Sequence, residues 1–321
     1  MREAMYWSVA DKEAVRCGLC PHRCIIAEGA EGICGVRVNR GGTLFAAGYG
    51  RLSSVALDPI EKKPLYLFHP GMRILSVGGY GCNFRCPFCQ NYEISTEWAR
   101  DHEFGVPDAN YIDDKDRNET QQADRKARKG SGGAVNTGKN RITPESVESL
   151  ALQTVQNGNI GVAYTYNEPL TGYEFLYDCA KLIRSAGLNN VIVTNGYIND
   201  EPLEALLPLI DAMNIDLKGF TESFYHKIGG GLEDVKKTIA RSNSSCHVEV
   251  TTLVLPGENE DDTEELAKWL ASVDPDIPLH LTRFFPRYRY ADKEPTPRET
   301  VFKLCDTAGK YLNNVFAGNM G

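Results

Sequence analysis

The sequence predicts an α/β fold, a partial (β/α)6 TIM-like barrel that follows a small cysteine-rich module. Two observations lead to this prediction. From Arg73 onward, short runs rich in Val, Ile and Leu alternate with longer amphipathic stretches, as strands and helices alternate in βαβ units. Before that point the chain holds four closely spaced cysteines and many glycine turns. Since the alternation gives six units rather than eight, the barrel is expected to be open.

Composition and charge exclude several classes of protein. Hydrophobic residues make up 42% of the 321 residues and charged residues 24%, which suffices for a large core. No apolar run approaches the ~18 residues that a membrane span needs. A net charge of −8 lacks the basic surface of a nucleic-acid-binding domain. Residues 1–15 contain no apolar signal segment, so we expect a cytoplasmic protein with neither a membrane nor nucleic acid as its partner.

The amino-terminal module carries a metal-binding pattern. Cys17, Cys20, Cys24 and Cys34 follow the spacing C-x2-C-x3-C-x9-C in a segment punctuated by Gly and Pro. Ten cysteines in a chain expected in the cytoplasm are better explained as ligands than as disulfides. Four thiolates close together predict a second metal site, because they bind soft metals and order a segment poor in apolar residues. The pattern leaves zinc, a single iron and an auxiliary iron–sulfur cluster open.

Domain boundaries follow from changes in composition. Residues 36–56 alternate apolar and polar side chains between glycine turns, which predicts a small antiparallel element that closes the first module. Residues 58–71 then form a packed linker with two adjacent lysines, which the family resemblance given below also lets line the approach to the active site. Residues 97–141 are dense in charge and poor in apolar residues, which predicts a mobile polar insertion. The expected domains are 1–71, then the barrel at 72–317 with this insertion, then a tail at 318–321.

Strands and helices are expected to alternate through the barrel. The expected strands are 73–77, 160–164, 190–194, 212–217, 247–255 and 279–285. The expected helices are 143–156, 170–186, 201–210, 232–241, 261–271 and 298–312. Thr143 and Pro144 indicate the start of the first helix, as its cap and its first-turn residue.

The loop after the first barrel strand is the candidate catalytic element. It holds Cys82, Cys86 and Cys89 at the spacing C-x3-C-x2-C. Three thiolates can hold three irons of a cubane cluster and leave the fourth iron open, whereas structural zinc takes four ligands and disulfides need an even number. A zinc site with a distant fourth ligand and three unconnected buried cysteines are the alternatives.

This loop also carries a family resemblance. C-x3-C-x-aromatic-C, with Phe88 as the aromatic residue, resembles the signature of the radical S-adenosylmethionine (radical SAM) superfamily. The string Cys-Pro-Phe-Cys-Gln-Asn-Tyr-Glu-Ile-Ser that starts at Cys86 resembles the AmmeMemoRadiSam-system radical SAM enzymes, which are related to pyruvate formate-lyase activating enzymes. The resemblance implies an oxidoreductase with a 4Fe-4S cluster on Cys82, Cys86 and Cys89, and with Phe88 near the adenine of S-adenosylmethionine.

The chemistry implied by the resemblance is radical formation. The reduced cluster cleaves S-adenosylmethionine to methionine and a 5′-deoxyadenosyl radical, which takes a hydrogen atom from a substrate. That substrate is either a protein, such as the backbone glycine of a glycyl-radical enzyme, or a small molecule. A flavodoxin or ferredoxin is implied as the low-potential electron donor.

Ligands of parallel α/β folds bind at the carboxyl ends of the strands, so the polar residues there are candidates. Glu168-Pro169 matches a Gly-Gly-Glu-Pro-like segment of the activating enzymes, which implies that Glu168 binds the amino group of S-adenosylmethionine. A carboxylate suits an ammonium group on chemical grounds as well. Tyr166 and Asn167 depart from the family glycines, which suggests a differently lined pocket. Alternatively, Glu168 caps the helix that follows.

Two further strand ends match family segments. Thr194-Asn195-Gly and Asp216-Leu-Lys218 resemble the Thr-Asn-Gly and Asp-Leu-Lys segments that face cofactor and substrate in the activating enzymes. Asp216 and Lys218 are two residues apart on a strand, so both point into one pocket unless they form only a structural ion pair. The candidate substrate contacts are Tyr166, His280 and Arg283.

A second class of function remains open. Both cysteine groups would also suit a non-catalytic metal or iron–sulfur scaffold, or an electron-transfer protein. Such a protein has no reason to respond to S-adenosylmethionine, so binding of that nucleotide distinguishes the two classes.

Overall fold

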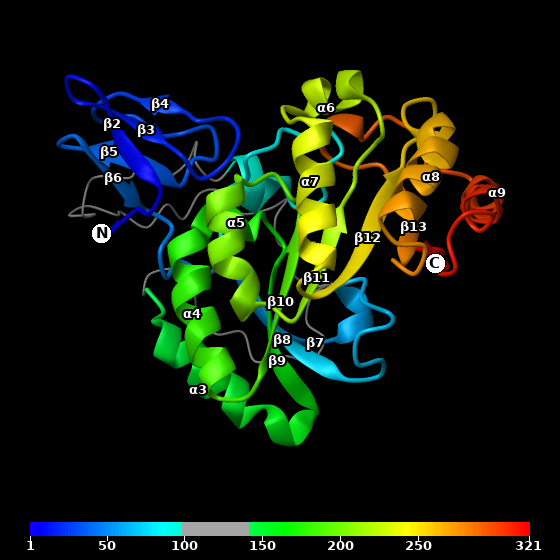
Figure 1. The fold of residues 1–321 in the computed structure, drawn as a ribbon, viewed down its shortest axis with the longest axis horizontal. Helices are drawn as coiled ribbons and strands as arrows, with labels where there is room; N and C mark the ends of the chain where they lie inside the picture. The colour runs from blue at the N-terminus through cyan, green and yellow to red at the C-terminus, as the bar shows by residue number, and fades with distance from the viewer. Residues whose placement is uncertain (98–140) are drawn as a thin grey trace, which may run out of the picture.

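The computed structural model describes residues 1–97 and 141–321. The predicted insertion therefore lies outside the described residues, except for Glu97 and Arg141. Figure 1 shows two parts: a small amino-terminal module of short strands, in blue, and a larger domain in which helices cover one face of a twisted sheet.

The large sheet confirms the predicted open α/β barrel. Its strand order is β14-β13-β12-β11-β10-β9-β8-β7. Strands β8 to β14 run parallel, while β7 pairs antiparallel with β8 at one edge. The strands are β7 (Ser54–Pro59), β8 (Arg73–Gly78), β9 (Asn159–Thr165), β10 (Asn189–Thr194), β11 (Ala212–Asp216), β12 (His247–Val254), β13 (Leu279–Arg283) and β14 (Val315–Gly318).

The helices alternate with these strands. The α-helices are α3 (Pro144–Gln153), α4 (Tyr173–Ser185), α5 (Asp200–Leu206), α6 (Glu222–Ile228), α7 (Leu232–Asn243), α8 (Thr263–Val273) and α9 (Arg298–Ala308). Shorter turns are η1 (Ile60–Lys62), η2 (Glu93–Glu97), η3 (Val155–Asn157), η4 (Pro169–Gly172), η5 (Leu207–Leu209), η6 (Glu260–Asp262) and η7 (Tyr288–Tyr290). Thr143 caps α3 by accepting a hydrogen bond from the amide of Ser146, with Pro144 at the first helical position as predicted. None of the helices described in the two ranges is long and apolar enough to span a bilayer.

Two strands of the sheet were not predicted. Residues 54–56 are expected in the closing element of the first module and residues 58–71 in a linker, yet β7 pairs with β8 from Ser54 opposite Gly78 to Pro59 opposite Arg73. β14 adds a seventh parallel strand beside β13. Both are edge strands that are only half-buried, so neither carries the continuous apolar run of a central parallel strand.

The amino-terminal module contains two three-stranded antiparallel sheets, with orders β2-β3-β4 and β1-β6-β5. Its strands are β1 (Arg2–Glu3), β2 (Trp7–Asp11), β3 (Ala14–Cys17), β4 (Ile25–Ile26), β5 (Arg37–Arg40) and β6 (Thr43–Ala46). The module is fixed to α4 by a buried ion pair in which Arg37 Nη1 lies 3.0 Å from Glu174 Oε1.

The segment after β7, residues 60–69, closes the amino-terminal end of the barrel. Leu65 is fully buried in an apolar cluster with Ile60 and with residues from four neighbouring strands, Ile74, Ala163, Val191 and Ala212. Near the start of β12, Glu249 accepts hydrogen bonds from the amides of Tyr66 (3.0 Å) and Leu67 (2.8 Å). The segment that sequence reading treated as a packed linker is therefore a stopper in the barrel.

Candidate active site

A cavity of about 380 Å³ opens at the carboxyl ends of the strands. The three loop cysteines line it together with Thr165 at the end of β9, Thr194 of β10, Asp216 of β11 and Thr282 of β13. The other lining residues used below are Lys62, Lys63, Phe88, Tyr166, Asn167, Glu168, Asn195, Lys218 and Asn319. The topology thus gathers residues that are up to 257 positions apart, from Lys62 to Asn319, around one space.

The cluster loop presents three free thiols to this cavity. The amide of Phe84 lies 3.3 Å from Cys82 Sγ, and Asn195 Nδ2 lies 3.8 Å from the same sulfur, so two donors point at it. Burial raises the pKa of Cys86 to about 12 and also raises those of Cys82 and Cys89. A metal that binds here must therefore displace thiol protons, as thiolate ligation always requires.

Glu168 is buried between the cavity and the end of β10. Its carboxylate accepts hydrogen bonds from Thr194 Oγ1 (2.7 Å), the amide of Asn195 (2.7 Å) and the amide of Leu170 (3.0 Å). Burial raises the pKa of Glu168 to about 7 in spite of these donors. The bond to Leu170 caps η4, so the alternative role as a helix cap is real and coexists with a place on the cavity wall.

Tyr166 and Asn167 also line the cavity, and each bonds a different part of its surroundings. The amide group of Asn167 bonds the loop around Gly79 and Gly81: its Oδ1 accepts from the amide of Gly79 (2.9 Å), and its Nδ2 donates to the carbonyl of Gly81 (3.0 Å). Tyr166 has a left-handed backbone with φ of 73°, and its hydroxyl donates to Asp58 Oδ2. Asn167 therefore shapes the cysteine loop.

Asp216 and Lys218 lie together in the cavity wall, and Lys218 Nζ donates to Asp216 Oδ2 at 2.9 Å. Burial opposes the charge on Lys218, but Asp216 and Cys86 raise its pKa above the usual value, so it stays an ammonium. Phe88 also lines the cavity, where its ring is stacked against Phe224 with centroids 6.2 Å apart. The predicted pairing of acid and base is thus present within the pocket rather than away from it.

His280 and Arg283 are not among the described residues that line the cavity. His280 is the second residue of β13, at the opposite end of the barrel, where its Nε2 lies 2.5 Å from Glu249 Oε2. Arg283 stands at the carboxyl end, but its Nε donates to the carbonyl of Thr296 at 2.6 Å. The structure does not bring these two candidates to the site, because His280 lies near the start of β13 and the side chain of Arg283 is bonded to Thr296.

Sequence reading missed the floor of the cavity as a polar cluster. Lys63 Nζ donates to Asp58 Oδ2 at 2.8 Å, Tyr166 Oη donates to the same oxygen at 2.7 Å, and the ammonium lies 4.7 Å from the centre of the Tyr166 ring. Burial alone would raise the pKa of Asp58, but the hydrogen bonds from Lys63 and Tyr166 lower it to about 2. The sequence shows the pair of lysines, and the family resemblance places them along the approach to the active site, but neither predicts the contacts of Lys63 with Asp58 and Tyr166.

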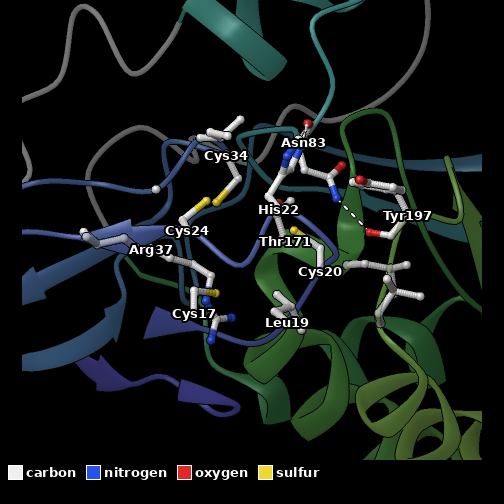
Figure 2. Close-up of a pocket in the computed structure, with 15 residues that line it drawn as sticks. Cys17, Leu19, Cys20, His22, Cys24, Cys34, Arg37, Asn83, Thr171 and Tyr197 are labelled. Atoms are coloured by element: carbon white, nitrogen blue, oxygen red, sulfur yellow. Dashed lines mark hydrogen bonds between the residues drawn. The ribbon is translucent and has the colours of Figure 1, made fainter. Parts of the chain in front are cut away.

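The four amino-terminal cysteines line a second cavity, shown in Figure 2. The thiols of Cys24 and Cys34 turn toward one another, while Cys17 and Cys20 face the cavity from other sides. Within residues 1–97 and 141–321, no three His, Cys, Asp or Glu side chains are already gathered closely enough to hold a single ion. The fit of either cysteine group to a metal therefore rests on its donor set, free thiols that face one shared space.

Comparison with known proteins identifies the family. Residues 76–270 match the model of the radical SAM superfamily. An uncharacterized protein of Methanocaldococcus jannaschii is 38% identical over 327 aligned positions, which cover 100% of this chain and 86% of that protein. A protein of the same organism, provisionally named a glycyl-radical enzyme activating enzyme, is 26% identical over 44% of this chain and 56% of its own length.

Solved structures show weaker similarity. A domain of pyruvate-formate lyase-activating enzyme from Bacteroides vulgatus is 20% identical, with a TM-score of 0.44, over 50% of this chain and 99% of that domain. Streptococcus suis SuiB bound to S-adenosylmethionine is 15% identical, with a TM-score of 0.45, over 57% of this chain and 44% of SuiB. At this level neither structure assigns a substrate. From the family match over more than half of its length, this chain belongs to the radical SAM superfamily.

Proposed function

We propose that this protein is a radical SAM oxidoreductase whose cluster is held by Cys82, Cys86 and Cys89. The observation that carries the proposal is that these three free thiols face one cavity at the carboxyl ends of the strands. Three thiols suit a 4Fe-4S cluster with one open iron, and the cavity beside them has room for a nucleotide-sized ligand. When bound, the cluster supplies the electron that cleaves S-adenosylmethionine to methionine and a 5′-deoxyadenosyl radical.

The side chains of the cavity divide the task of holding that cofactor. Asn195 donates toward Cys82 Sγ, and an N–H directed at a cluster sulfur tunes its potential. Glu168 offers a buried carboxylate to the amino group of the methionyl part, and its three donors fix the direction of that carboxylate. Lys218 offers an ammonium for the carboxylate or a ribose hydroxyl, and Phe88 offers an apolar face to the adenine.

The substrate is proposed from similarity and is tested separately. The matched archaeal activating enzyme supports hydrogen abstraction from the backbone glycine of a partner protein, and a small-molecule substrate is the second candidate. A flavodoxin or ferredoxin is the proposed electron donor. Ten free thiols and a reduced cluster suit a reducing compartment, so we place the protein in the cytoplasm. Anaerobic capture from cells of a protein that gains a glycyl-radical signal would favour the first candidate.

The central test is removal of one cluster thiol. Wild type, Cys82→Ala and the matched control Cys305→Ala, a half-buried cysteine of α9, are reconstituted without oxygen. Iron, sulfide and 5′-deoxyadenosine are then measured after reduction with S-adenosylmethionine present. We expect Cys82→Ala to lose about four irons per chain and all nucleoside formation, because two thiolates do not hold a cubane. Equal nucleoside yields in wild type and Cys82→Ala would refute the proposal.

The rival function, a metal scaffold or electron carrier, makes a different prediction. Its reduced protein would give the same electron paramagnetic resonance spectrum with and without S-adenosylmethionine. The proposed enzyme changes its spectrum, because the nucleotide binds at the cluster. Glu168→Gln is the informative variant, since weaker binding of the ammonium should shift the concentration of nucleotide needed for that change upward.

A further inference from the structure

The amino-terminal cysteine cavity and the cluster loop pack directly against one another. At Gly81, where φ is +85°, an added Cβ would lie 2.5 Å from the carbonyl oxygen of Cys34, so the two backbones touch. His22 Nε2 lies 2.8 Å from the carbonyl oxygen of Asn83. Arg85 donates to the carbonyls of Ile33 and Cys82, so one guanidinium bonds both segments. Contacts from separate residues therefore join the two segments.

One side chain links the two cavities. Asn83 directly follows Cys82 in the cluster loop, and it lines the amino-terminal cavity. Its Oδ1 accepts a hydrogen bond of 2.8 Å from Asn195 Nδ2, the donor that also lies 3.8 Å from Cys82 Sγ. Its Nδ2 donates to the carbonyl of Tyr197 at 2.9 Å. Figure 2 shows Asn83 beside His22 at the rim of this cavity. A shift of Asn83 would thus be felt at Cys82.

Arg37 gives the amino-terminal cavity an unsatisfied donor. Its side chain is 1% exposed, and Figure 2 shows it beside Cys17. Nη1 pairs with Glu174 and Nη2 donates to the carbonyl of Met5, but Nε is buried without an acceptor among the described residues. A buried N–H without a partner is destabilising. A metal-bound thiolate is an acceptor that would satisfy it, and the buried guanidinium suits the negative charge of a tetrathiolate centre.

We propose that Cys17, Cys20, Cys24 and Cys34 bind a metal as thiolates with Arg37 as their hydrogen-bond donor, and that this centre positions the cluster loop through Asn83. Binding draws the four sulfurs inward and releases their protons. The first half stands on the amino-terminal cavity alone. The second half rests on the proposed function, since it concerns the cluster on the loop. Zinc, a single iron and an iron–sulfur cluster share the same thiolate chemistry, and metal analysis distinguishes them.

The first experiment measures metal content of the full chain. Zinc, iron and sulfide per chain are compared in wild type, in the triple variant Cys17→Ser/Cys20→Ser/Cys24→Ser, and in the control Cys305→Ser. We expect the triple variant to lose one zinc, one iron, or a set of iron and sulfide, and the control to lose none. Equal metal content in wild type and the triple variant would overturn the proposal. Failure of the proposed function gives a different result: Cys82→Ala would then contain as much iron as wild type.

Arg37 is tested with its buried partner replaced as well. Arg37→Met/Glu174→Gln removes both charges together, because a lone Glu174 would be left buried and charged. We expect the affinity for the amino-terminal metal to fall about 10- to 100-fold, as is usual when a group that hydrogen-bonds to a metal ligand is removed. Glu174→Gln alone keeps Nε in place and should retain the affinity. Unchanged affinity in the double variant would refute the role of Arg37.

Coupling to the cluster loop is read by electron paramagnetic resonance of the reduced protein. His22→Ala leaves all four thiols but removes the contact to Asn83, so we expect full metal content with altered g values of the loop cluster. The triple variant should show the same alteration. Unaltered g values in both variants, with the amino-terminal metal lost from the triple variant, would show that the two centres are independent.

Discussion

The ion pair on the cavity floor allows its energy to be tested directly. Asp58 and Lys63 have side chains that are 15% and 3% exposed, so water screens their charges poorly. The pKa of Asp58 falls from its ordinary 3.8 to about 2 although burial opposes this, which at about 1.4 kcal/mol per pH unit means that its surroundings as a whole stabilise the carboxylate by roughly 2.5 kcal/mol. Burial has the opposite effect on Lys63, whose pKa is lowered despite the attraction of Asp58.

These directions predict an asymmetric double-mutant cycle. Asp58→Asn leaves the ammonium of Lys63 buried without its partner and should destabilise the fold by about 3–5 kcal/mol. Lys63→Met removes a donor from Asp58 but leaves Tyr166, so its cost should be nearer 2 kcal/mol. The double variant Asp58→Asn/Lys63→Met buries no net charge and should cost about 1 kcal/mol or less.

The assay is urea unfolding of the full chain at pH 7 without oxygen, followed by far-UV circular dichroism. The free energies of unfolding of wild type and three variants give the coupling energy of the pair, expected to exceed about 2 kcal/mol. Lys62→Met is the control, because its ammonium is 67% exposed and lies 3.6 Å from Asp58. Costs below about 0.5 kcal/mol for both single variants, adding up in the double variant, would show that the pair behaves like an exposed one and that the reasoning fails.

Three further predictions concern the site and the barrel. Glu168→Gln should lower stability by about 1–3 kcal/mol in urea titrations, because its amide nitrogen faces a donor that the carboxylate accepted; a variant as stable as wild type would contradict this account. Gly81→Ala should lose cluster iron because its Cβ meets the Cys34 carbonyl, whereas Gly71→Ala, at a similar φ of +82° with open space around it, should keep its iron; equal iron contents would be inconsistent with that contact. The pKa of Glu249 is held at about 2 against an ordinary 4.5, so its roughly 3 kcal/mol of stability is complete above pH 4.5 and lost as the pH falls toward 2; Glu249→Gln should flatten the acid limb of stability against pH, and an unchanged slope would count against it.

The sequence was most informative where residues are close together or central. The central strands β9 to β12 could be predicted, because buried parallel strands are continuous apolar runs. The cysteine loop could be recognised because its three cysteines are close together in the sequence. The helix α6 was not predicted, since its seven residues are too few for a clear helical period, although Thr221 caps it and Gly229 ends it.

Contacts that cross the chain could not be read from the sequence. The Asn83–Asn195 bond joins residues 112 positions apart, and Tyr166 meets Asp58 across 108 positions. His280 shows the same limit from the other side. Its strand was predicted correctly, yet its place near the first residue of β13 puts it against Glu249 instead of the cavity. Direction along a strand decides this, and a candidate chosen by residue type alone does not include it.

The stopper formed by residues 60–69 gives the barrel a depth. Leu65 is buried at its base and Lys63 lines the cavity, so a ligand that enters past the cysteines is stopped at this end. The depth of the cavity, from this base to the thiols, limits the length of ligand that fits. A longer ligand extends out of the cavity opening. Shortening or lengthening the side chain at position 63 would therefore be a direct way to change the size of molecule that the cavity holds.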